Sequence, residues 1–344
     1  MRVKIKQSVL SSKKYDIRIR NAFRKKIKRR NIEIPHIVGS KPKSPRAKFP
    51  KKKIYTPSML IFPYNLKELI AYLDEIEKFK GSYRLGIDHS KMQMIDNVSI
   101  LLLTAGVNGI FDDKKLVKNK KLAPNKEINE RLSAIGYWEA LCVNPPISNK
   151  DLDYLKIRNH DGEKIDNNLH TDILDFFIKH HNIPEIYRDN LFDAIYEAMV
   201  NTKEHAYSGT KRNLWFLGAY DKDKDEIEFL IYDKGMGIFK SLETSNKMLA
   251  NFLRKCVKMF GKDKTLEILC TTNLSKHKKT DKKRGLGMKT YKEFVDSIKS
   301  GTENAYASLE VATDNLLYAS EEGVVKMNAG IEGTLIRWKI GGLR

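Results

Sequence analysis

Three short segments, taken in order along the chain, constrain its fold more than composition does. They lie within residues 197–205, 233–237 and 283–287. The surrounding sequence predicts that the first lies on a helix, that the second ends a strand, and that the third opens another helix. In this order the segments predict an α/β fold in which all three converge on one pocket.

Residues 187–207 predict a helix, because apolar side chains recur there at helical spacing. Glu197, Asn201 and His205 follow at intervals of four and therefore share one flank of that helix. The apolar stripe beside them consists of Leu191, Ala194, Ile195, Ala198, Met199 and Thr202.

The polar flank offers groups suited to a magnesium nucleotide. Asn201 supplies an amide oxygen, the kind of hard ligand that Mg²⁺ takes beside phosphates. Glu197, one turn earlier, can orient and deprotonate a water or hydroxyl that attacks a terminal phosphate. The alternative is an ordinary amphipathic helix whose polar flank is solvated.

Residues 226–232 predict a largely buried strand that stops at Asp233. Gly235 and Gly237 then permit a tight turn and a close approach of the main chain to a ligand. A carboxylate fixed at a strand end can accept a hydrogen bond from an exocyclic amine such as that of adenine. The alternative is a common hairpin turn.

A second glycine turn, at Gly285 and Gly287, precedes a predicted helix at residues 289–300. Glycine at a helix start leaves N–H groups pointing outward, which favours phosphate. Lys283 and Arg284 add positive charge where the phosphates would lie. The alternative is a loop before a helix, flanked by solvated lysines.

Together these residues resemble the ATPase domain called GHKL, or the Bergerat fold, which gyrase and histidine kinases share. The resemblance covers residues 185–342 and implies a two-layer α/β sandwich that binds ATP and Mg²⁺. It implies that Glu197 is the general base, that Asn201 binds Mg²⁺, and that Asp233 holds the adenine amine.

The same resemblance assigns the glycine turns. Gly285 and Gly287 would cradle phosphates, and Thr334 falls in the family's last motif, before an apolar strand. The spacing through His205 is most similar to that of anti-sigma-factor serine kinases. The segment between the glycine turns, residues 238–283, is long for the family's lid and predicts helices around 247–260 and 264–271.

Residues 54–145 predict a smaller α/β unit that resembles a STAS domain. In that family a partner kinase phosphorylates a serine or threonine at the start of a helix; here Ser99 is the candidate, ahead of Ser90. The alternative is that Asp96 caps this helix and Ser99 has no special role. The predicted strands and helices of the unit are 55–62, 65–79, 83–88, 96–105 and 125–141.

Positive charge is concentrated at the start of the chain. Residues 1–53 hold 20 Lys and Arg side chains against Asp16 and Glu33, whereas the whole chain has a formal net charge of +21. Such a basic arm predicts salt-dependent binding to nucleic acid or another polyanion. The alternatives are a solvated tail and a docking arm for an acidic protein.

These features predict three parts: a basic extension at 1–53, the STAS-like unit at 54–145 and the ATP-binding domain at 146–344. The last would finish its sheet with strands at 307–312, 316–318, 323–327 and 333–340. Three cysteines without pairing or metal spacing and no signal peptide favour a cytoplasmic protein, and no segment is long and apolar enough for a membrane span.

The sequence therefore predicts a magnesium-ATP-binding regulator that hydrolyses ATP or phosphorylates a partner. Kinase and hydrolase are not separable from the residues, because both use the same carboxylate. An alternative is a nucleic-acid-binding subunit of a larger assembly in which the ATP site acts as a conformational switch. A folded pocket without turnover is a third possibility, against which the pairing of Glu197 with Asn201 argues.

Overall fold

The fold is mixed α/β, as the sequence predicts. A computed structural model describes residues 51–79, 84–110, 121–141, 144–146, 153–160, 167–181, 185–205, 214–245, 248–272, 287–301 and 303–343. Contacts divide the chain at Lys48 and Phe49, and every described residue belongs to the second unit.

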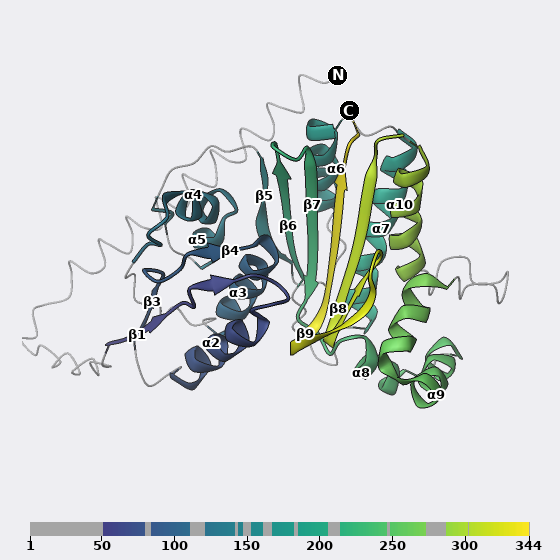
Figure 1. The fold of residues 1–344 in the computed structure, drawn as a ribbon, viewed down its shortest axis with the longest axis horizontal. Helices are drawn as coiled ribbons and strands as arrows, with labels where there is room; N and C mark the ends of the chain where they lie inside the picture. The colour runs from purple at the N-terminus through teal and green to yellow at the C-terminus, as the bar shows by residue number, and fades with distance from the viewer. Residues whose placement is uncertain are drawn as a thin grey trace, which may run out of the picture. The chain divides into compact units, whose positions relative to one another are not determined.

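The first part of the described chain is a layer of short parallel strands and helices (Figure 1). β1 pairs with β3, and β2 pairs with β4, both in parallel. Its elements are β1 (Lys51–Tyr55), β2 (Met59–Leu60), α2 (Leu66–Phe79), β3 (Arg84–Asp88), β4 (Met94–Ile95), α3 (Asn97–Ile110), α4 (Lys126–Ala134) and α5 (Tyr137–Ala140). We call this part the N-terminal layer.

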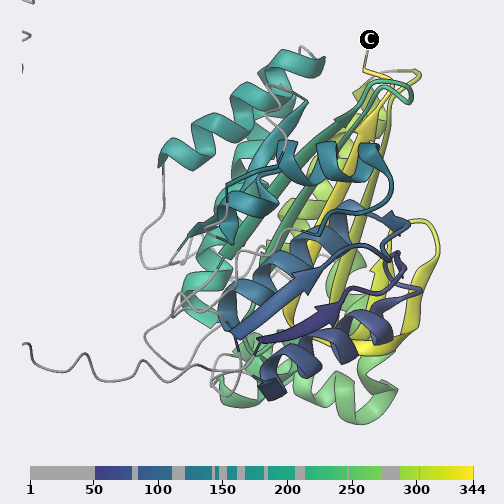
Figure 2. The same ribbon diagram turned by 90° about the vertical axis from the view of Figure 1, so that its left-hand side faces the viewer.

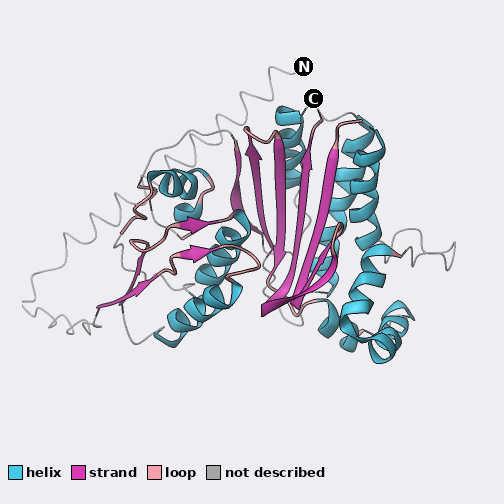
Figure 3. Ribbon diagram, in the orientation of Figure 1, coloured by secondary structure: helices cyan, strands magenta, loops and turns pink. Residues whose placement is uncertain are grey.

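The remaining described residues form an antiparallel sheet with its helices (Figure 3). Its described strands run in the order β5-β6-β7-β9-β8, so the last two strands in the chain are exchanged in space. The elements are β5 (Tyr154–His160), α6 (Asn167–His181), α7 (Glu185–His205), β6 (Leu214–Asp221), β7 (Glu226–Asp233), α8 (Ile238–Thr244), α9 (Met248–Thr271), α10 (Gly287–Gly301), β8 (Tyr306–Ala319) and β9 (Gly323–Gly341).

Both faces of this sheet are covered, because its strands are apolar on both sides. Phe229 and Ile231 of β7 pack in one core with α6, α7 and α10. Leu230 and Tyr232 of the same strand pack in a second core with the N-terminal layer. Figure 2 shows this layer in front of the sheet.

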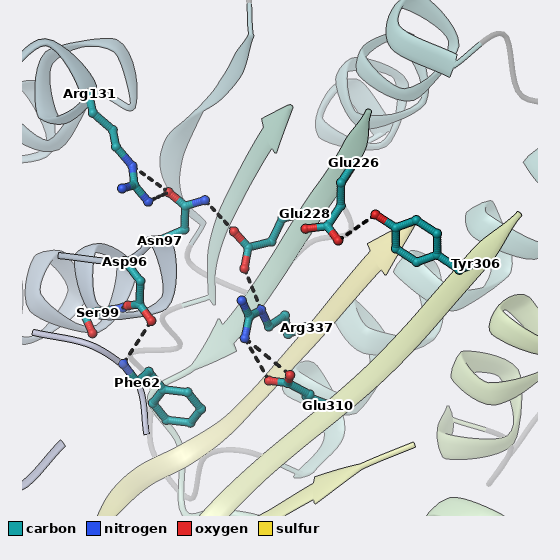
Figure 4. A network of polar contacts seen from close by, with 10 residues as sticks. All are labelled: Phe62, Asp96, Asn97, Ser99, Arg131, Glu226, Glu228, Tyr306, Glu310 and Arg337. Carbon is teal, nitrogen blue, oxygen red and sulfur yellow. Dashed lines mark hydrogen bonds and ion pairs between the residues drawn. The ribbon is translucent and has the colours of Figure 1, made fainter. Parts of the chain in front are cut away.

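A chain of polar side chains crosses from the N-terminal layer to the sheet (Figure 4). Arg131 of α4 donates to the Oδ1 atom of Asn97 at 2.6 Å, and the Asn97 amide donates to Glu228 of β7. Arg337 of β9 in turn lies between Glu228 and Glu310, 3.1 Å from the Oε2 atom of Glu310. Burial raises the pKa of Glu228, but the Arg337 guanidinium, the Asn97 hydrogen bond and the charge of Lys339 together hold that pKa below its usual value.

The start of α3 is held by a carboxylate. Asp96 accepts the backbone N–H of Ser99 at 2.7 Å and that of Phe62 at 2.9 Å, so it caps the helix and ties it to the preceding strand segment. Ser99 is only 3% exposed. This arrangement favours the alternative in which Asp96 is a cap and Ser99 is not a phosphoacceptor.

Several predicted elements are confirmed within one to three residues, namely α2, β3, α7, β7 and α10, and α3 begins within one residue of its predicted start but runs on to Ile110. The six side chains of the predicted stripe on α7 are all buried. The two predicted lid helices are also present, since α9 is broken at Gly261, where φ is +85°. The remaining stretch of that lid, residues 273–283, lies outside the described residues.

Other boundaries differ from the prediction. The strand expected at 55–62 is two shorter strands, β1 and β2, and β1 begins at Lys51 inside the predicted basic extension. The helix expected at 125–141 is divided because Gly136 takes a φ of +86°. Four predicted final strands are two long ones, β8 and β9, whose register shifts near Asp314.

None of the helices in the described ranges is both long and apolar enough to cross a membrane. Cys256 and Cys270 are buried as free thiols, whereas Cys142 lies outside the described residues. The proposed division of the chain at residue 145 stays a prediction.

We expect the Arg337→Ala substitution to lower the free energy of unfolding by about 3–5 kcal/mol, because it leaves the buried Glu228 carboxylate without its cation. Urea unfolding measures the change. The matched control is Lys262→Ala, which removes a more exposed ion pair with Asp314 and should cost no more than about 1 kcal/mol. Similar small losses in both variants would contradict the importance of the buried network.

Candidate functional site

The end of β7 forms a turn stabilised by its own carboxylate. Asp233 is the last residue of the strand, and its Oδ1 atom accepts the backbone N–H of Gly235 at 3.0 Å. Opposite it on β9 stands Thr334, which also hydrogen-bonds to the Asp233 carboxylate. The first glycine turn and the last motif predicted from the sequence are thus neighbours in space.

A second glycine shapes the end of the sheet where Asp233 and Thr334 pair, a region that we call the corner. Gly333, with a φ of +78°, lies so near the turn that a Cβ atom built on it would stand 1.8 Å from the carbonyl oxygen of Asp233. Gly237 has a φ of +78° as well, and it immediately precedes α8. The Thr313 hydroxyl accepts the N–H of Ile238 at 3.1 Å, which anchors α8 to β8. The sheet end therefore needs glycine at both turns.

The Asp233 carboxyl group has an unusual environment. Burial raises its pKa from the ordinary value of 3.8 to about 7, although its hydrogen bonds with Gly235 and Thr334 act in the opposite direction. A carboxyl group poised in this way at a strand end is characteristic of a binding or catalytic position.

The helices α7 and α10 contact each other through Asn201 and Tyr291. The Nδ2 atom of Asn201 donates to the Tyr291 hydroxyl oxygen at 3.1 Å. Burial raises the Tyr291 pKa, and the nearby charges of Glu197 and Asp233 raise it further. Asn201 therefore contacts the Tyr291 phenol directly, and the charges of Glu197 on α7 and Asp233 on β7 both act on it.

The structure thus brings together most of the described residues that the sequence singles out. The charges of Glu197 and Asp233 both act on Tyr291, to which Asn201 is hydrogen-bonded, and Thr334, Gly235 and Gly237 lie around the turn that Asp233 starts. Gly287 is the first residue of α10, one turn before Tyr291. Lys283, Arg284 and Gly285 lie outside the described residues, as does the side chain of His205, the last residue of α7.

Two residues of this corner were missed by the sequence prediction. Tyr291 and Thr313 are 1% and 0% exposed, and each forms a hydrogen bond that shapes the site. The sequence held a signal in both cases, because each is the polar side chain on an otherwise apolar face of its helix or strand. Tyr291 shares the buried face of α10 with Phe294, Val295 and Ile298.

The donor groups suit a cation that brings its own ligands. No cluster of three or more His, Cys, Asp or Glu side chains that could hold a metal occurs in the described part of the chain. Mg²⁺ often takes only one or two protein ligands and completes its shell with water and phosphate. The Asn201 amide fits this use, because its nitrogen donates to Tyr291 and its oxygen, the atom that can ligate a cation, points away from that contact.

Comparison of the chain with models of protein families finds no match, and comparison with curated proteins finds none either. Function is accordingly inferred from the residues of the site.

The raised pKa of Asp233 makes stability depend on pH in a predictable direction. The native state binds a proton that the unfolded state has lost, so the free energy of unfolding should fall as pH rises from 3.8 towards 7, and then level off. We expect a contribution of about 1 kcal/mol per pH unit within this window.

The Asp233→Asn variant tests this expectation, because it removes the titration but keeps an acceptor for the Gly235 N–H. Urea unfolding of both proteins between pH 5 and pH 8 gives the comparison. The difference in stability between wild type and variant should shrink or reverse as pH rises. Parallel profiles would show that burial does not hold the proton on Asp233.

Proposed function

We propose that the sheet and helices after residue 146 form an ATP-binding domain of the GHKL, or Bergerat, class, and that it hydrolyses ATP or phosphorylates a partner. One observation carries this proposal. The helices α7 and α10 come together near the end of β7 and the part of β9 that contains Thr334. Asn201 of α7 donates to Tyr291 of α10, Asp233 of β7 pairs with Thr334 of β9, and the charge of Asp233 also acts on Tyr291.

The layout of that corner supports the proposal in two ways. Asp233 stands at a strand end beside a glycine turn, where a ligand's exocyclic amine can donate to its carboxylate and where Thr334 provides a second polar contact. The main chain at Gly235 and Gly237 carries no side chain that would keep a ligand away from the turn.

Glu197 is the proposed general base. It lies on the same helix as Asn201, one turn earlier, and its negative charge contributes to raising the pKa of Tyr291. In this role it accepts the proton of a water molecule or a partner's hydroxyl group while that oxygen attacks the terminal phosphate. Mg²⁺, when bound through the Asn201 amide oxygen, would neutralise negative charge on the phosphates.

The N-terminal layer is proposed to be a STAS-like module fused to this domain. Its βα repeats with parallel strand pairs are consistent with that assignment. Because Ser99 is buried beside its Asp96 cap, the layer is proposed to act by packing on the sheet, and not as a substrate of the ATP site.

Isothermal titration with a non-hydrolysable ATP analogue tests nucleotide binding. We expect the unmodified protein to bind in the presence of Mg²⁺. Glu197→Gln should keep this binding but lower phosphate release or transfer by about 10²-fold or more, because only the base is removed. Asn201→Ala should weaken Mg²⁺-dependent binding by about tenfold or more.

Asp193→Asn is the matched control for Glu197→Gln, since Asp193 lies on the same helix one turn earlier and is exposed. It should leave both binding and turnover unchanged. Absence of binding by the unmodified protein would refute the proposed function, and turnover that survives Glu197→Gln would refute the role of this residue.

A second proposed function concerns the basic arm. Residues 1–53 carry most of the net charge of +21, which is the pattern of a phosphate-binding segment. The arm would bind nucleic acid, and nucleotide at the ATP site would act as a conformational switch within a larger assembly.

Deletion of residues 1–48 should abolish retention on DNA and RNA columns at low salt, because the remaining chain begins at the boundary of the folded unit and lacks the arm. Binding of the ATP analogue should persist. Full-length protein should elute early when salt rises from 50 to 200 mM. Equal retention of the full-length and truncated proteins would assign binding to another surface.

A further inference from the structure

Tyr291 makes one contact that the proposed function does not use. Its hydroxyl oxygen accepts a hydrogen bond from the Nδ2 atom of Asn201 at 3.1 Å. A side-chain amide has a donor end and an acceptor end. When the nitrogen is bound to the phenol, the Oδ1 atom is directed away from it, so the contact determines which end of the amide a ligand meets.

The phenol ring is itself held rigidly. Tyr291 is 1% exposed and stands edge-on to Trp338, with ring centroids 5.4 Å apart. Trp338 in turn stacks on Phe229 of β7 at 5.9 Å. The hydroxyl is thus fixed by aromatic packing in the centre of the helix-side core, and partners of this kind orient groups that bind metals.

We propose that Tyr291 is a positioning residue that holds the Asn201 amide with its oxygen presented to a nucleotide-bound divalent cation. This inference rests on the proposed function, because Asn201 is a metal ligand only if the site binds a magnesium nucleotide. Without the hydroxyl, the amide is free to turn its nitrogen, which cannot ligate a cation, towards the metal.

The competing explanation is that Tyr291 only packs α10 against α7 and the sheet. The two explanations differ in what Tyr291→Phe should change, since phenylalanine keeps the ring and removes one oxygen. Loss of packing would affect nucleotide binding whether or not metal is present. Loss of amide orientation would affect only the part of the affinity that the metal contributes.

The experiment measures the Kd of a non-hydrolysable ATP analogue by calorimetry, once with Mg²⁺ and once with EDTA. We expect Tyr291→Phe to reduce the gain in affinity given by Mg²⁺ about tenfold. Affinity in EDTA should equal that of the unmodified protein. Equal losses in both conditions would overturn the proposal in favour of packing, and no loss in either would overturn it as well.

Tyr187→Phe is the matched control. Tyr187 is a buried tyrosine of α7 whose hydroxyl lies against Gly301 at the opposite end of the same helix pair. This variant should leave affinity unchanged with Mg²⁺ and with EDTA. Thermal unfolding of both variants establishes that each is folded under the conditions of the titration.

A variant at position 201 distinguishes side-chain orientation from every other effect of the Tyr291 hydroxyl. Asn201→Asp places two equivalent oxygens at the position, so no orientation remains to be lost. Adding Tyr291→Phe to Asn201→Asp should therefore leave the gain given by Mg²⁺ unchanged within twofold. A further tenfold loss in this background would overturn the proposal.

Failure of this inference is separable from failure of the proposed function. If the unmodified protein does not bind the analogue, nucleotide binding itself is refuted and the role of Tyr291 with it. If the unmodified protein binds and gains affinity from Mg²⁺ but Tyr291→Phe behaves identically, only the positioning role is refuted.

Discussion

The alternation of side chains along β7 is the constraint on which the rest of the structure depends. Phe229 and Ile231 enter the core beneath α7 and α10, whereas Leu230 and Tyr232 enter the core shared with the N-terminal layer. One strand therefore holds two cores, because its successive residues face opposite sides. A slip of one residue would exchange the two sets and would place the Glu228 carboxylate among the apolar helices. The register of β7 is thus fixed from both sides at once.

The same register determines the geometry of the candidate site. Glu228 faces the N-terminal layer, and Asp233, an odd number of residues later, faces the helices. On β9, Arg337 likewise faces the N-terminal layer, and Thr334, three residues earlier, faces the helices. The ladder that brings Arg337 to Glu228 also pairs Asp233 with Thr334. Packing of the N-terminal layer on one face of the sheet therefore fixes the position of the Asp233 turn on the other face. No loop is needed to align Asp233 with Thr334.

The sequence predicted those parts of the fold and site whose signals are local. The stripe on α7 and the apolar run ending at Asp233 each need only neighbouring residues to be recognised. The exchange of β8 with β9 was not predicted, because strand order depends on contacts between distant segments. β5 and β6 were also missed, although the apolar run of β6 is a local signal. Tyr291 was missed for a similar reason, since its partner Asn201 is 90 residues away. On sequence alone it stands out only as the polar member of a buried helix face, and nothing local indicates which residue its hydroxyl contacts.

The buried network between the layer and the sheet is better understood as an alignment device than as a source of stability. Desolvation of Glu228 and Arg337 offsets much of their attraction, so an apolar pair could stabilise the contact as well. An apolar contact, however, tolerates sliding, whereas Asn97, Glu228 and Arg337 meet in one arrangement only. The network therefore specifies where the N-terminal layer sits on β7 and β9.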